Sequence, residues 1–437
     1  MKYNIIDFGA KSNGELCTKE IQDAIDKAFL SGGGEVVIPC GRFLIGCIRL
    51  RSNVTLHLME GAALVGSIDP EDYFSYLDDE IEPICEDEKS QKVSTATPQA
   101  NSQSVFPYSR WNNAVIRAIK AQNIAIIGEK NSFIDGQNCY DEQGEENYRG
   151  PHGVNMWFCE NIKLSGYTII DSGNWAHAIQ NSKNVEMNKV TVLGGHDGFD
   201  IRTCGRVTVE DCEFRSGDDA IAGFDNIDVT VRNCTLNTSC SVLRFGGTNV
   251  LVENCVTVAP NEYGFRGNLS LEEKKARAQT NEKCRHSCHH AFLYYCDYRA
   301  KVRETPGNIL FRNCKFSNID SVFMEAFGHR WSCNRGLDSI EFDRCIFENV
   351  CYPITISGSE DEPLTFVMKN CVISAREGAG NEPVVEAMNF RDIIFENVTL
   401  NGYASPKIVY CTEGDISITD STGIKLEKGE KCSRSGH

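Results

Sequence analysis

The sequence lacks an excess of basic residues. Its 437 residues include 44 Lys and Arg against 61 Asp and Glu, which gives a formal net charge of −17. Nucleic acids and anionic membranes bind to basic protein faces, so this balance argues against either as a partner. A long polyanionic substrate would need a site that is locally basic.

Long apolar runs are also missing. We find no run of about 18 apolar residues that could span a membrane as a helix. The opening residues 1–10 lack the apolar core and the small-residue cleavage site of a secretory signal peptide. We therefore expect no membrane partner and a cytoplasmic location.

Cysteine, in contrast, is plentiful, with 21 residues spread through the chain. Dense disulfide frameworks are typical of small secreted domains, whereas this chain is large enough to bury a sizeable core. Many of the cysteines lie in strand-like patterns, where a buried thiol behaves as a small hydrophobic side chain. We therefore expect a reducing compartment.

A repeat of about 22 residues indicates the architecture. Each copy has two apolar residues separated by one position, then two polar residues, then Cys or another apolar residue. Successive copies end at Tyr167, Val190, Cys212, Cys234 and Cys255, which are 23, 22, 22 and 21 positions apart. This period is too short for helix-pair repeats and is typical of one turn of a parallel β-helix.

The repeat also predicts where its side chains lie. Apolar residues two positions apart point into the coil, and the two polar residues form the bend before the next strand. The final thiols then stack in an inward ladder: Cys212, Cys234, Cys255, Cys314, Cys345 and Cys371. Metal binding is the rival interpretation, but one Cys per coil lacks the paired spacing of zinc sites, so we predict no metal.

The N-terminal region predicts a cap for the β-helix. Ile21, Ala24, Ile25 and Ala28 have helical spacing behind Thr18 as an N-cap, and three glycines at 32–34 end the helix. A short helix here would cover the open end of the solenoid. Strands are expected at 35–39, 42–50 and 54–58.

Two long insertions interrupt the repeat, at about residues 67–110 and 261–307. Insertions in a solenoid gather on one face and often build the walls of a binding site. Solvated loops without a ligand are the alternative. Within the second insertion, residues 284–290 hold two Cys and three His, but the set lacks a second pair of ligands, so we expect a loop rather than a zinc site.

Three acids are the strongest candidates for chemistry. Asp197 precedes Asp218 and Asp219 by 21 and 22 positions, which is one turn of the repeat. Strands of adjacent coils lie about 4.8 Å apart, so the three acids would meet within reach of one glycosidic bond. An isolated Asp-Asp pair is otherwise typical of a turn.

Several other polar residues are candidates for contact with a substrate. Arg202 and Arg244 end strands beside the acids and could bind a carboxylate through two parallel hydrogen bonds, or form surface ion pairs. His177 follows Trp175, a possible stacking platform, and the two either contact sugar or only pack. His196 adjoins Asp197 and could orient it.

These motifs resemble the polygalacturonase-like glycoside hydrolases of family 28, which belong to the superfamily of pectin-lyase-like, right-handed β-helices. The resemblance covers most of the chain. Its motifs include Ile5-Ile-Asp-Phe-Gly-Ala10, Arg149-Gly-Pro-His152, Ser172-Gly-Asn-Trp175 and, most specific, Asp197-Gly-Phe-Asp-Ile201 and Gly217-Asp-Asp-Ala-Ile-Ala222. We therefore predict an all-β, right-handed parallel β-helix, formed as a single domain over residues 1–437.

The resemblance implies inverting hydrolysis of a galacturonide bond without a cofactor. Asp218 would be the general acid, and Asp197 and Asp219 the bases that activate water. Inverting glycosidases hold their two carboxyl groups roughly 6.5–9.5 Å apart, which leaves room for that water. Crowded acids keep one proton bound near neutral pH.

Two departures from the family pattern bear on the substrate. Cys240, in Ser239-Cys-Ser241, replaces a His, and Asn268 stands where a Lys is expected after Arg266. Asp200, three positions after Asp197, is a candidate further acid of a variant site. We expect exo-attack on oligosaccharides derived from pectin, either galacturonides or compounds related to rhamnogalacturonan.

Two other classes of function stay open. A non-catalytic carbohydrate-binding β-helix would account for the replaced His and Lys. A lyase or transferase is the second, although a lyase normally uses calcium and a Lys or Arg base, and its unsaturated product would identify it. The sequence does not determine the oligomeric state.

Overall fold

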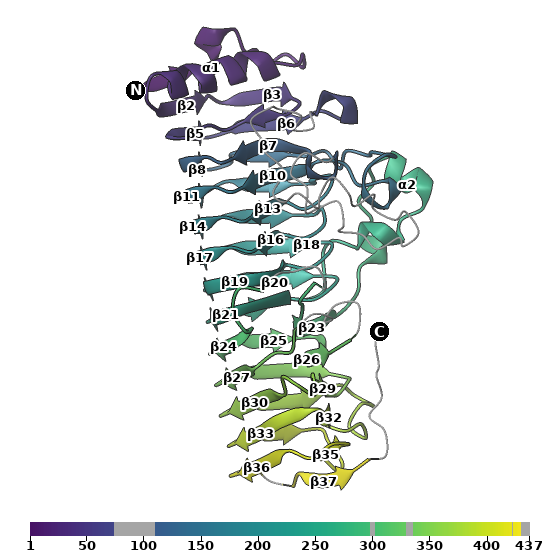
Figure 1. Ribbon diagram of the computed structural model, residues 1–437. Helices are drawn as coiled ribbons and strands as arrows, with labels where there is room; N and C mark the ends of the chain where they lie inside the picture. The colour runs from purple at the N-terminus through teal and green to yellow at the C-terminus, as the bar shows by residue number, and fades with distance from the viewer. Residues whose placement is uncertain (74–109, 298–301, 329–334, 422, 430–437) are drawn as a thin grey trace.

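The computed structural model is a tall stack of parallel strands with the N-terminal helix at one end (Figure 1). It describes residues 1–73, 110–297, 302–328, 335–421 and 423–429. The predicted all-β, right-handed parallel β-helix is confirmed. The assignment of residues 1–437 to a single domain stays a prediction. No helix within the described ranges is long and apolar enough to cross a membrane.

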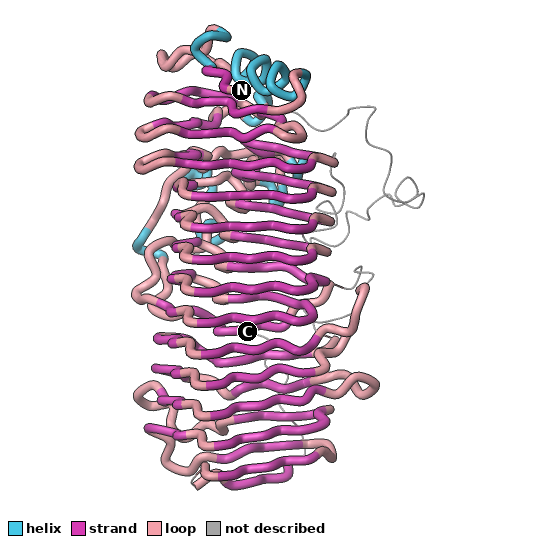
Figure 2. Tube along the Cα trace, turned by 90° about the vertical axis from the view of Figure 1, so that its left-hand side faces the viewer, coloured by secondary structure: helices cyan, strands magenta, loops and turns pink. Residues whose placement is uncertain are grey.

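Each central coil contributes three strands, and equivalent strands stack into three series (Figure 2). The first series consists of β4 (Ile48–Arg49), β7 (Ala114–Ile119), β10 (His152–Trp157), β13 (His177–Gln180), β16 (Phe199–Arg202), β19 (Ile221–Arg232), β21 (Leu243–Glu253), β23 (Cys288–Tyr294), β26 (Ile319–Ala326), β29 (Ile354–Ser357), β32 (Val385–Met388), β35 (Lys407–Tyr410) and β37 (Lys425–Lys428).

The second series adjoins the first and shares its long strands β19 and β21. Its other members are β1 (Lys2–Asn4), β2 (Gly34–Ile38), β5 (Val54–Leu58), β8 (Gln122–Gly128), β11 (Glu160–Ser165), β14 (Lys183–Asn188), β17 (Gly205–Glu210), β24 (Gly307–Arg312), β27 (Ser339–Asp343), β30 (Leu364–Lys369), β33 (Phe390–Glu396) and β36 (Asp415–Thr419).

The third series forms a separate sheet. It consists of β3 (Gly41–Ile45), β6 (Ala62–Gly66), β9 (Phe133–Asp135), β12 (Thr168–Ile170), β15 (Thr191–Leu193), β18 (Glu213–Ser216), β20 (Thr235–Thr238), β22 (Val256–Thr257), β25 (Lys315–Ser317), β28 (Ile346–Val350), β31 (Val372–Ala375) and β34 (Thr399–Asn401).

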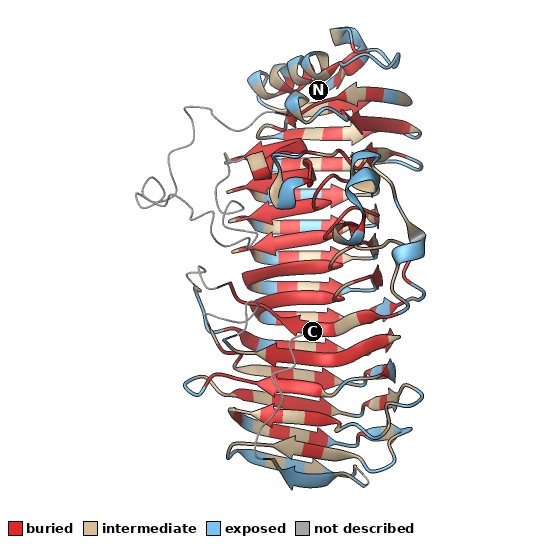
Figure 3. Cartoon of the chain, turned by 90° about the vertical axis from the view of Figure 1, so that its right-hand side faces the viewer, coloured by how far each residue is buried: buried red, intermediate tan, exposed pale blue. Residues whose placement is uncertain are grey.

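The register of the second series follows the sequence repeat. Val185 pairs in parallel with Val207, Val207 with Val229, and Val229 with Val250. These side chains are buried, as Figure 3 shows for bands of residues along the whole stack. The repeat of about 22 residues therefore corresponds to one coil.

The cysteine ladder is confirmed. Its six members, Cys212, Cys234, Cys255, Cys314, Cys345 and Cys371, are buried and free. The residue before each of them has a φ between +53° and +56°, as at Asp211, Asn233 and Asn254. Asn and Asp adopt this left-handed conformation more easily than most residues, which explains why polar residues occupy the bend.

The N-terminal cap forms as predicted, with one difference. Helix α1 (Thr18–Leu30) buries Ile21, Ala24, Ile25 and Ala28. Thr18 is not the N-cap: Cys17 holds that position without a side-chain capping bond, and the Thr18 hydroxyl accepts a hydrogen bond from Gly46 N at 2.8 Å. The hydroxyl thus joins the helix to the first coil. A short 3-10 helix, η1 (Ile5–Phe8), precedes α1.

The strand expected at 42–50 is divided into β3 and β4. The chain turns between them at Gly46, where an added Cβ would lie 2.1 Å from the Asp72 carbonyl oxygen. A side chain does not fit in this corner, so the strand ends there. The strands expected at 35–39 and 54–58 correspond to β2 and β5.

The two insertions differ in what the structure describes. Most of the first, residues 74–109, lies outside the described residues, and its flanks hold η2 (Pro70–Asp72) and η5 (Arg110–Asn112). The second contains η7 (Arg266–Asn268), α2 (Leu271–Lys275) and η8 (Asn281–Lys283), and its residues 298–301 lie outside the description. The insertion is shorter than expected because β23 pairs with β21 and β26, so residues 288–290 are strand rather than loop.

The second insertion folds back over earlier coils. Figure 1 shows α2 beside the coils of β10 and β13. Arg277 donates a hydrogen bond to the Gln137 carbonyl oxygen at 3.3 Å, and Arg266 donates to the carbonyl oxygens of Gly173 and Asn138. These contacts bring the insertion next to the loops that carry the acids.

Candidate active site

The three acids lie where the chain enters the first strand series. Asp197 precedes β16, and Asp218 and Asp219 precede β19 on the next coil. Phe199 of β16 pairs with Ile221 of β19, and Gly198 N donates to the Asp219 carbonyl oxygen at 3.0 Å. The parallel register therefore carries Asp197 to the same level as Asp219.

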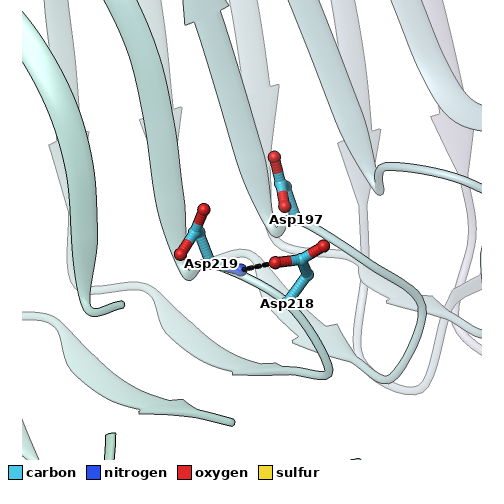
Figure 4. Close-up of side chains that lie close together, drawn as sticks. All are labelled: Asp197, Asp218 and Asp219. Atoms are coloured by element: carbon cyan, nitrogen blue, oxygen red, sulfur yellow. Dashed lines mark hydrogen bonds between the residues drawn. The ribbon is translucent and has the colours of Figure 1, made fainter. Parts of the chain in front are cut away.

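The three carboxyl groups converge on one point (Figure 4). One carboxylate oxygen of each acid can be chosen so that all three oxygens lie within 4.8 Å of one another. Asp218 accepts a hydrogen bond from Asp219 N at 3.1 Å, and its carbonyl oxygen accepts one from Ser216 Oγ at 3.0 Å. These bonds fix the turn that presents the pair. The sequence spacing alone predicted this convergence.

Arg244 contacts two of the three acids. Its Nε donates to Asp219 Oδ2 at 2.5 Å, and its Nη2 lies 3.5 Å from Asp197 Oδ2. The other oxygen of Asp219 accepts from Ser241 N at 2.8 Å. The guanidinium lies 4.4 Å from the centre of the Tyr295 ring. In this structure Arg244 therefore binds the protein's own carboxylates.

Asp218 is the most exposed of the three acids. Its side chain is 17% exposed, against 1% for Asp197 and 5% for Asp219. Arg149 Nη2 lies 3.6 Å from Asp218 Oδ2, and His196 Nδ1 lies 4.0 Å from the same oxygen. Asp218 is thus the carboxyl that a substrate can reach most directly.

Burial and mutual repulsion favour a bound proton in this cluster. Burial, and next the charge of Asp219, raise the pKa of Asp218 to about 6, although Arg149 and Arg244 oppose the shift. Burial, followed by the charges of Asp218 and Asp219, raises the pKa of Asp197 well above its usual value. The acids titrate as a coupled group, so the proton belongs to the cluster before a substrate selects its donor.

His196 is completely buried beside the cluster, between the rings of Tyr148 and Phe265. Burial, and next the charge of Arg149, keep its pKa well below the usual value, so the imidazole is neutral. Neither ring nitrogen has a hydrogen-bond partner among the described residues. Its closest acid is Asp218, and we find no bond by which it would orient Asp197.

His177 is also buried, and its contacts give it a structural role. One ring nitrogen lies 2.9 Å from the Tyr167 hydroxyl, and the other donates to the Gly198 carbonyl oxygen at 3.1 Å. Burial lowers the His177 pKa to about 4. The ring therefore holds the loop that carries Asp197.

Asp200 and Arg202, both on β16, form an ion pair with two hydrogen bonds. Arg202 Nε donates to Asp200 Oδ1 at 2.7 Å, and Nη2 donates to Oδ2 at 3.0 Å. The guanidinium also lies 4.5 Å from the centre of the Trp175 ring. All three side chains are buried. Their contacts favour the interpretation that they pack and support the acid-bearing coil.

Arg266 lies at the edge of the site in η7. It is buried, and burial lowers its pKa to about 10. It donates hydrogen bonds to the carbonyl oxygens of Gly173 and Asn138 at 3.1 and 3.2 Å. It therefore ties the second insertion to the loop before β13.

Sequence reasoning missed several charged residues near Asp218. Arg149 Nε lies 2.9 Å from Glu146 and 3.7 Å from Glu145, beside η6 (Glu145–Asn147). Lys274 Nζ lies 4.3 Å from the centre of the Tyr148 ring. The family motif beginning at Arg149 was the available signal. Lys274 gave none, because its helix reaches the site only through tertiary folding.

The acids are the one described group of side chains arranged to ligate a metal. Arg244 already pairs with Asp197 and Asp219, and Arg149 faces Asp218. These guanidinium groups supply the compensating positive charge, which disfavours a divalent cation in the same place.

A wide surface groove lies elsewhere, on the second strand series. It has a volume of about 760 Å³ and runs past Glu186, Thr208, Thr230 and Leu251. None of the three acids lines it. Its position does not bear on their chemistry.

Comparison with known proteins relates the site to a family. Residues 85–266, which carry all three acids, match the family described as Glycosyl hydrolases family 28. The predicted resemblance to family 28 is confirmed.

Curated relatives agree with this family. The chain is 26% identical to a probable polygalacturonase of Vitis vinifera, over 52% of this chain and 45% of the relative. It is 31% identical to an exo-poly-alpha-D-galacturonosidase of Dickeya chrysanthemi, over 30% of this chain and 19% of the relative. The matches thus span less than half the length of these two relatives.

The fold is shared with an exopolygalacturonase of Thermotoga maritima. The two structures superpose with a TM-score of 0.65 at 18% identity, over 92% of each chain. This likeness shows a common β-helix fold.

Proposed function

We propose that this family 28 protein is a glycoside hydrolase that cleaves pectin-derived oligosaccharides. The observation that carries the proposal is the meeting of three carboxyl groups, of which Asp218 is the most exposed and the other two share Arg244. The family match and the relatives named as polygalacturonases support a galacturonide as substrate.

Asp218 acts as the general acid in this proposal. Its proton passes to the glycosidic oxygen while the bond from that oxygen to the anomeric carbon breaks. A water held by Asp197 and Asp219 bonds to the anomeric carbon and gives its proton to one of these carboxylates. An acid with a pKa of about 6 is suited to this work, because proton transfer is most effective when the pKa lies near the working pH.

The stereochemical outcome we propose is inversion. Separation alone does not favour it: the nearest oxygens of the acids lie within 4.8 Å, whereas inverting pairs usually stand roughly 6.5–9.5 Å apart and retaining pairs about 5–5.5 Å. The surroundings of the bases do favour it. Both oxygens of Asp219 accept hydrogen bonds, and Asp197 is 1% exposed, so a water reaches them more easily than a sugar carbon.

We further propose exo-attack on short oligosaccharides. The limited exposure of the acids suits the end of a chain better than the middle of a polymer. The Dickeya chrysanthemi relative is itself named as an exo-acting galacturonosidase. The cytoplasmic location expected from the sequence stays a prediction and would agree with imported oligosaccharides.

The test combines a panel of pectic oligosaccharides with reducing-end detection and NMR of the first product. Asp218→Asn should lower kcat by about 10²–10⁴ or more, because an amide cannot donate the proton, while the turn keeps its acceptor for Asp219 N. Asp211→Asn is the matched control, since other bends already have Asn at that place.

Each other result would identify an alternative. Binding of oligosaccharides without release of reducing ends would support a non-catalytic carbohydrate-binding protein. An unsaturated product would indicate a lyase. A retained anomer would overturn inversion while leaving hydrolysis in place.

A further inference from the structure

Arg244 occupies a position between the acid-bearing coils and the coil that follows. It lies on β21, where it pairs with Ala222 of β19 and Leu293 of β23. From there its side chain reaches back to Asp219 on the adjacent coil and to Asp197 on the coil before that. One guanidinium thus spans carboxylates from two coils.

We propose that Arg244 is a positioning residue that acts on the enzyme's own carboxylates: it holds Asp197 and Asp219 at a fixed separation, and its positive charge opposes protonation of Asp197 and so favours the cluster's proton on Asp218. This inference rests on the proposed hydrolase function. It replaces the expectation, based on sequence, that Arg244 binds the substrate.

The contacts of the guanidinium oppose a role as a substrate clamp. Binding a substrate carboxylate in the bidentate manner uses two parallel N–H groups on one edge of the guanidinium. The Nε and Nη2 groups of Arg244 point at Asp219 and Asp197, and Tyr295 stacks against the guanidinium. The residue is only 8% exposed. A substrate would have to displace these contacts.

The surrounding charges explain why Arg244 decides the protonation of the bases. Within the described ranges, it is the one cation within 4.0 Å of either Asp197 or Asp219. On β16, Arg202 is paired with Asp200. Arg149, from the loop after η6, faces Asp218 instead, and so does His196.

Two further titratable groups face the cluster. Tyr295, which follows β23, stacks on Arg244, and the Cys240 thiol after β20 lies beside Asp218. Burial raises the pKa of both groups, so both are neutral at the pH at which the acids work. They therefore do not replace the positive charge of Arg244.

Removal of this charge has a defined consequence for the pH profile. An opposite charge within about 4–6 Å lowers the pKa of a carboxyl by roughly 1–3 units. Without Arg244, Asp197 binds its proton at higher pH, and this base is lost in the range where the wild type works. The acid limb of the kcat/KM profile should therefore move upward by about one pH unit or more.

The experiment compares Arg244→Gln with Arg244→Lys. We expect Gln to lower kcat by about 10²-fold or more, with KM little changed and the acid limb shifted upward. Lys keeps the charge but cannot contact both acids with one planar group, so the limb should stay near its wild-type position while kcat falls. Arg303→Gln is the control, because it removes a different Arg–Asp pair, with Asp225, and should leave the limb in place.

An activity-independent measurement separates this inference from the proposed function. Carbon-13 NMR of the aspartate carboxyl groups should show Asp197 titrating at higher pH in Arg244→Gln than in the wild type. If no oligosaccharide is hydrolysed by the wild type, the proposed function fails and this titration still decides the role of Arg244.

Two outcomes would overturn the inference. A rise of tenfold or more in KM with unmoved pH limbs would assign Arg244 to substrate binding. A lower unfolding temperature with unchanged carboxyl titration would make the residue purely structural. If Arg244→Gln does not fold, Arg244→Lys decides: a KM effect alone, with kcat and titration unchanged, would also overturn it.

Discussion

Asp197 and Asp219 share one guanidinium and, in the proposed reaction, one water. Asp197→Asn and Asp219→Asn should each lower kcat by about 10²–10⁴, and the double variant should lose little more than the worse single variant, because both residues serve the same step. Steady-state kinetics of the three variants tests this. Asp228→Asn is the control. Asp228 lies within β19, and Asn in its place keeps the oxygen that accepts a hydrogen bond from Asn249. Losses that multiply in the double variant would show that the two acids act separately.

A second prediction at the scale of one residue concerns stability. Glu325 on β26 is buried, its Oε2 has no hydrogen-bond partner, and burial raises its pKa to about 8. The folded state thus binds a proton that the unfolded state releases near pH 4.5, so stability falls as the pH rises from about 4.5 to 8. Glu325→Gln should remove this fall and stabilise the protein by several kcal/mol at pH 8.

Denaturant unfolding at pH 5 and pH 8 measures the effect of Glu325. Glu341→Gln is the matched control, because that residue forms a half-exposed ion pair with Lys369. Equal changes in the free energy of unfolding at both pH values would contradict a buried, protonated Glu325.

Single residues divide clearly into those that the sequence could predict and those that it could not. The distance of one repeat places Asp197 beside Asp219, so the convergence follows from periodicity. The partners of these acids do not. Arg149 approaches Asp218 from an earlier loop, and only the family motif that begins at this residue marks it. Lys274, which contacts the Tyr148 ring rather than an acid, comes from a helix that folds back over the coils, so no local pattern marks it.

At the scale of elements, the cysteine ladder makes a prediction about reactivity. Its six thiols are buried in the coil interior, where a reagent in water does not reach them. Alkylation of the native protein followed by mass spectrometry should leave them unmodified. Cys40, which is free and exposed, should react and serves as the internal control. Labelling of ladder cysteines before unfolding would refute the buried ladder.

The elements themselves were predictable to the extent that they repeat. The paired apolar residues set the register of the second series from β11 through β33, and the polar bend residues have the left-handed backbone that the pattern implies. The exceptions have local causes. Gly46 divides an expected strand because the corner leaves no room for a Cβ, and β23 belongs to the first series although its sequence shows no copy of the repeat.

At the scale of the whole molecule, the charge of −17 acts on every anionic substrate that approaches. The negative charges of the protein surface repel a polygalacturonate chain along much of its length. A short oligosaccharide is affected mainly by the charges in the site itself. The Debye length falls from about 30 Å at 0.01 M salt to about 10 Å at 0.1 M, so added salt should screen the repulsion of the polymer more than that of a trimer.

We therefore expect the ratio of kcat/KM for long polygalacturonate to kcat/KM for trigalacturonate to rise several-fold over this range of salt. Initial rates for both substrates, measured at fixed pH with a neutral viscosity control, test the expectation. The comparison of two substrates cancels effects of salt on the carboxyl cluster itself, because both substrates use the same acids. A ratio that falls with salt would mean that a basic path attracts the polymer toward Asp218, and the net charge would then not govern access.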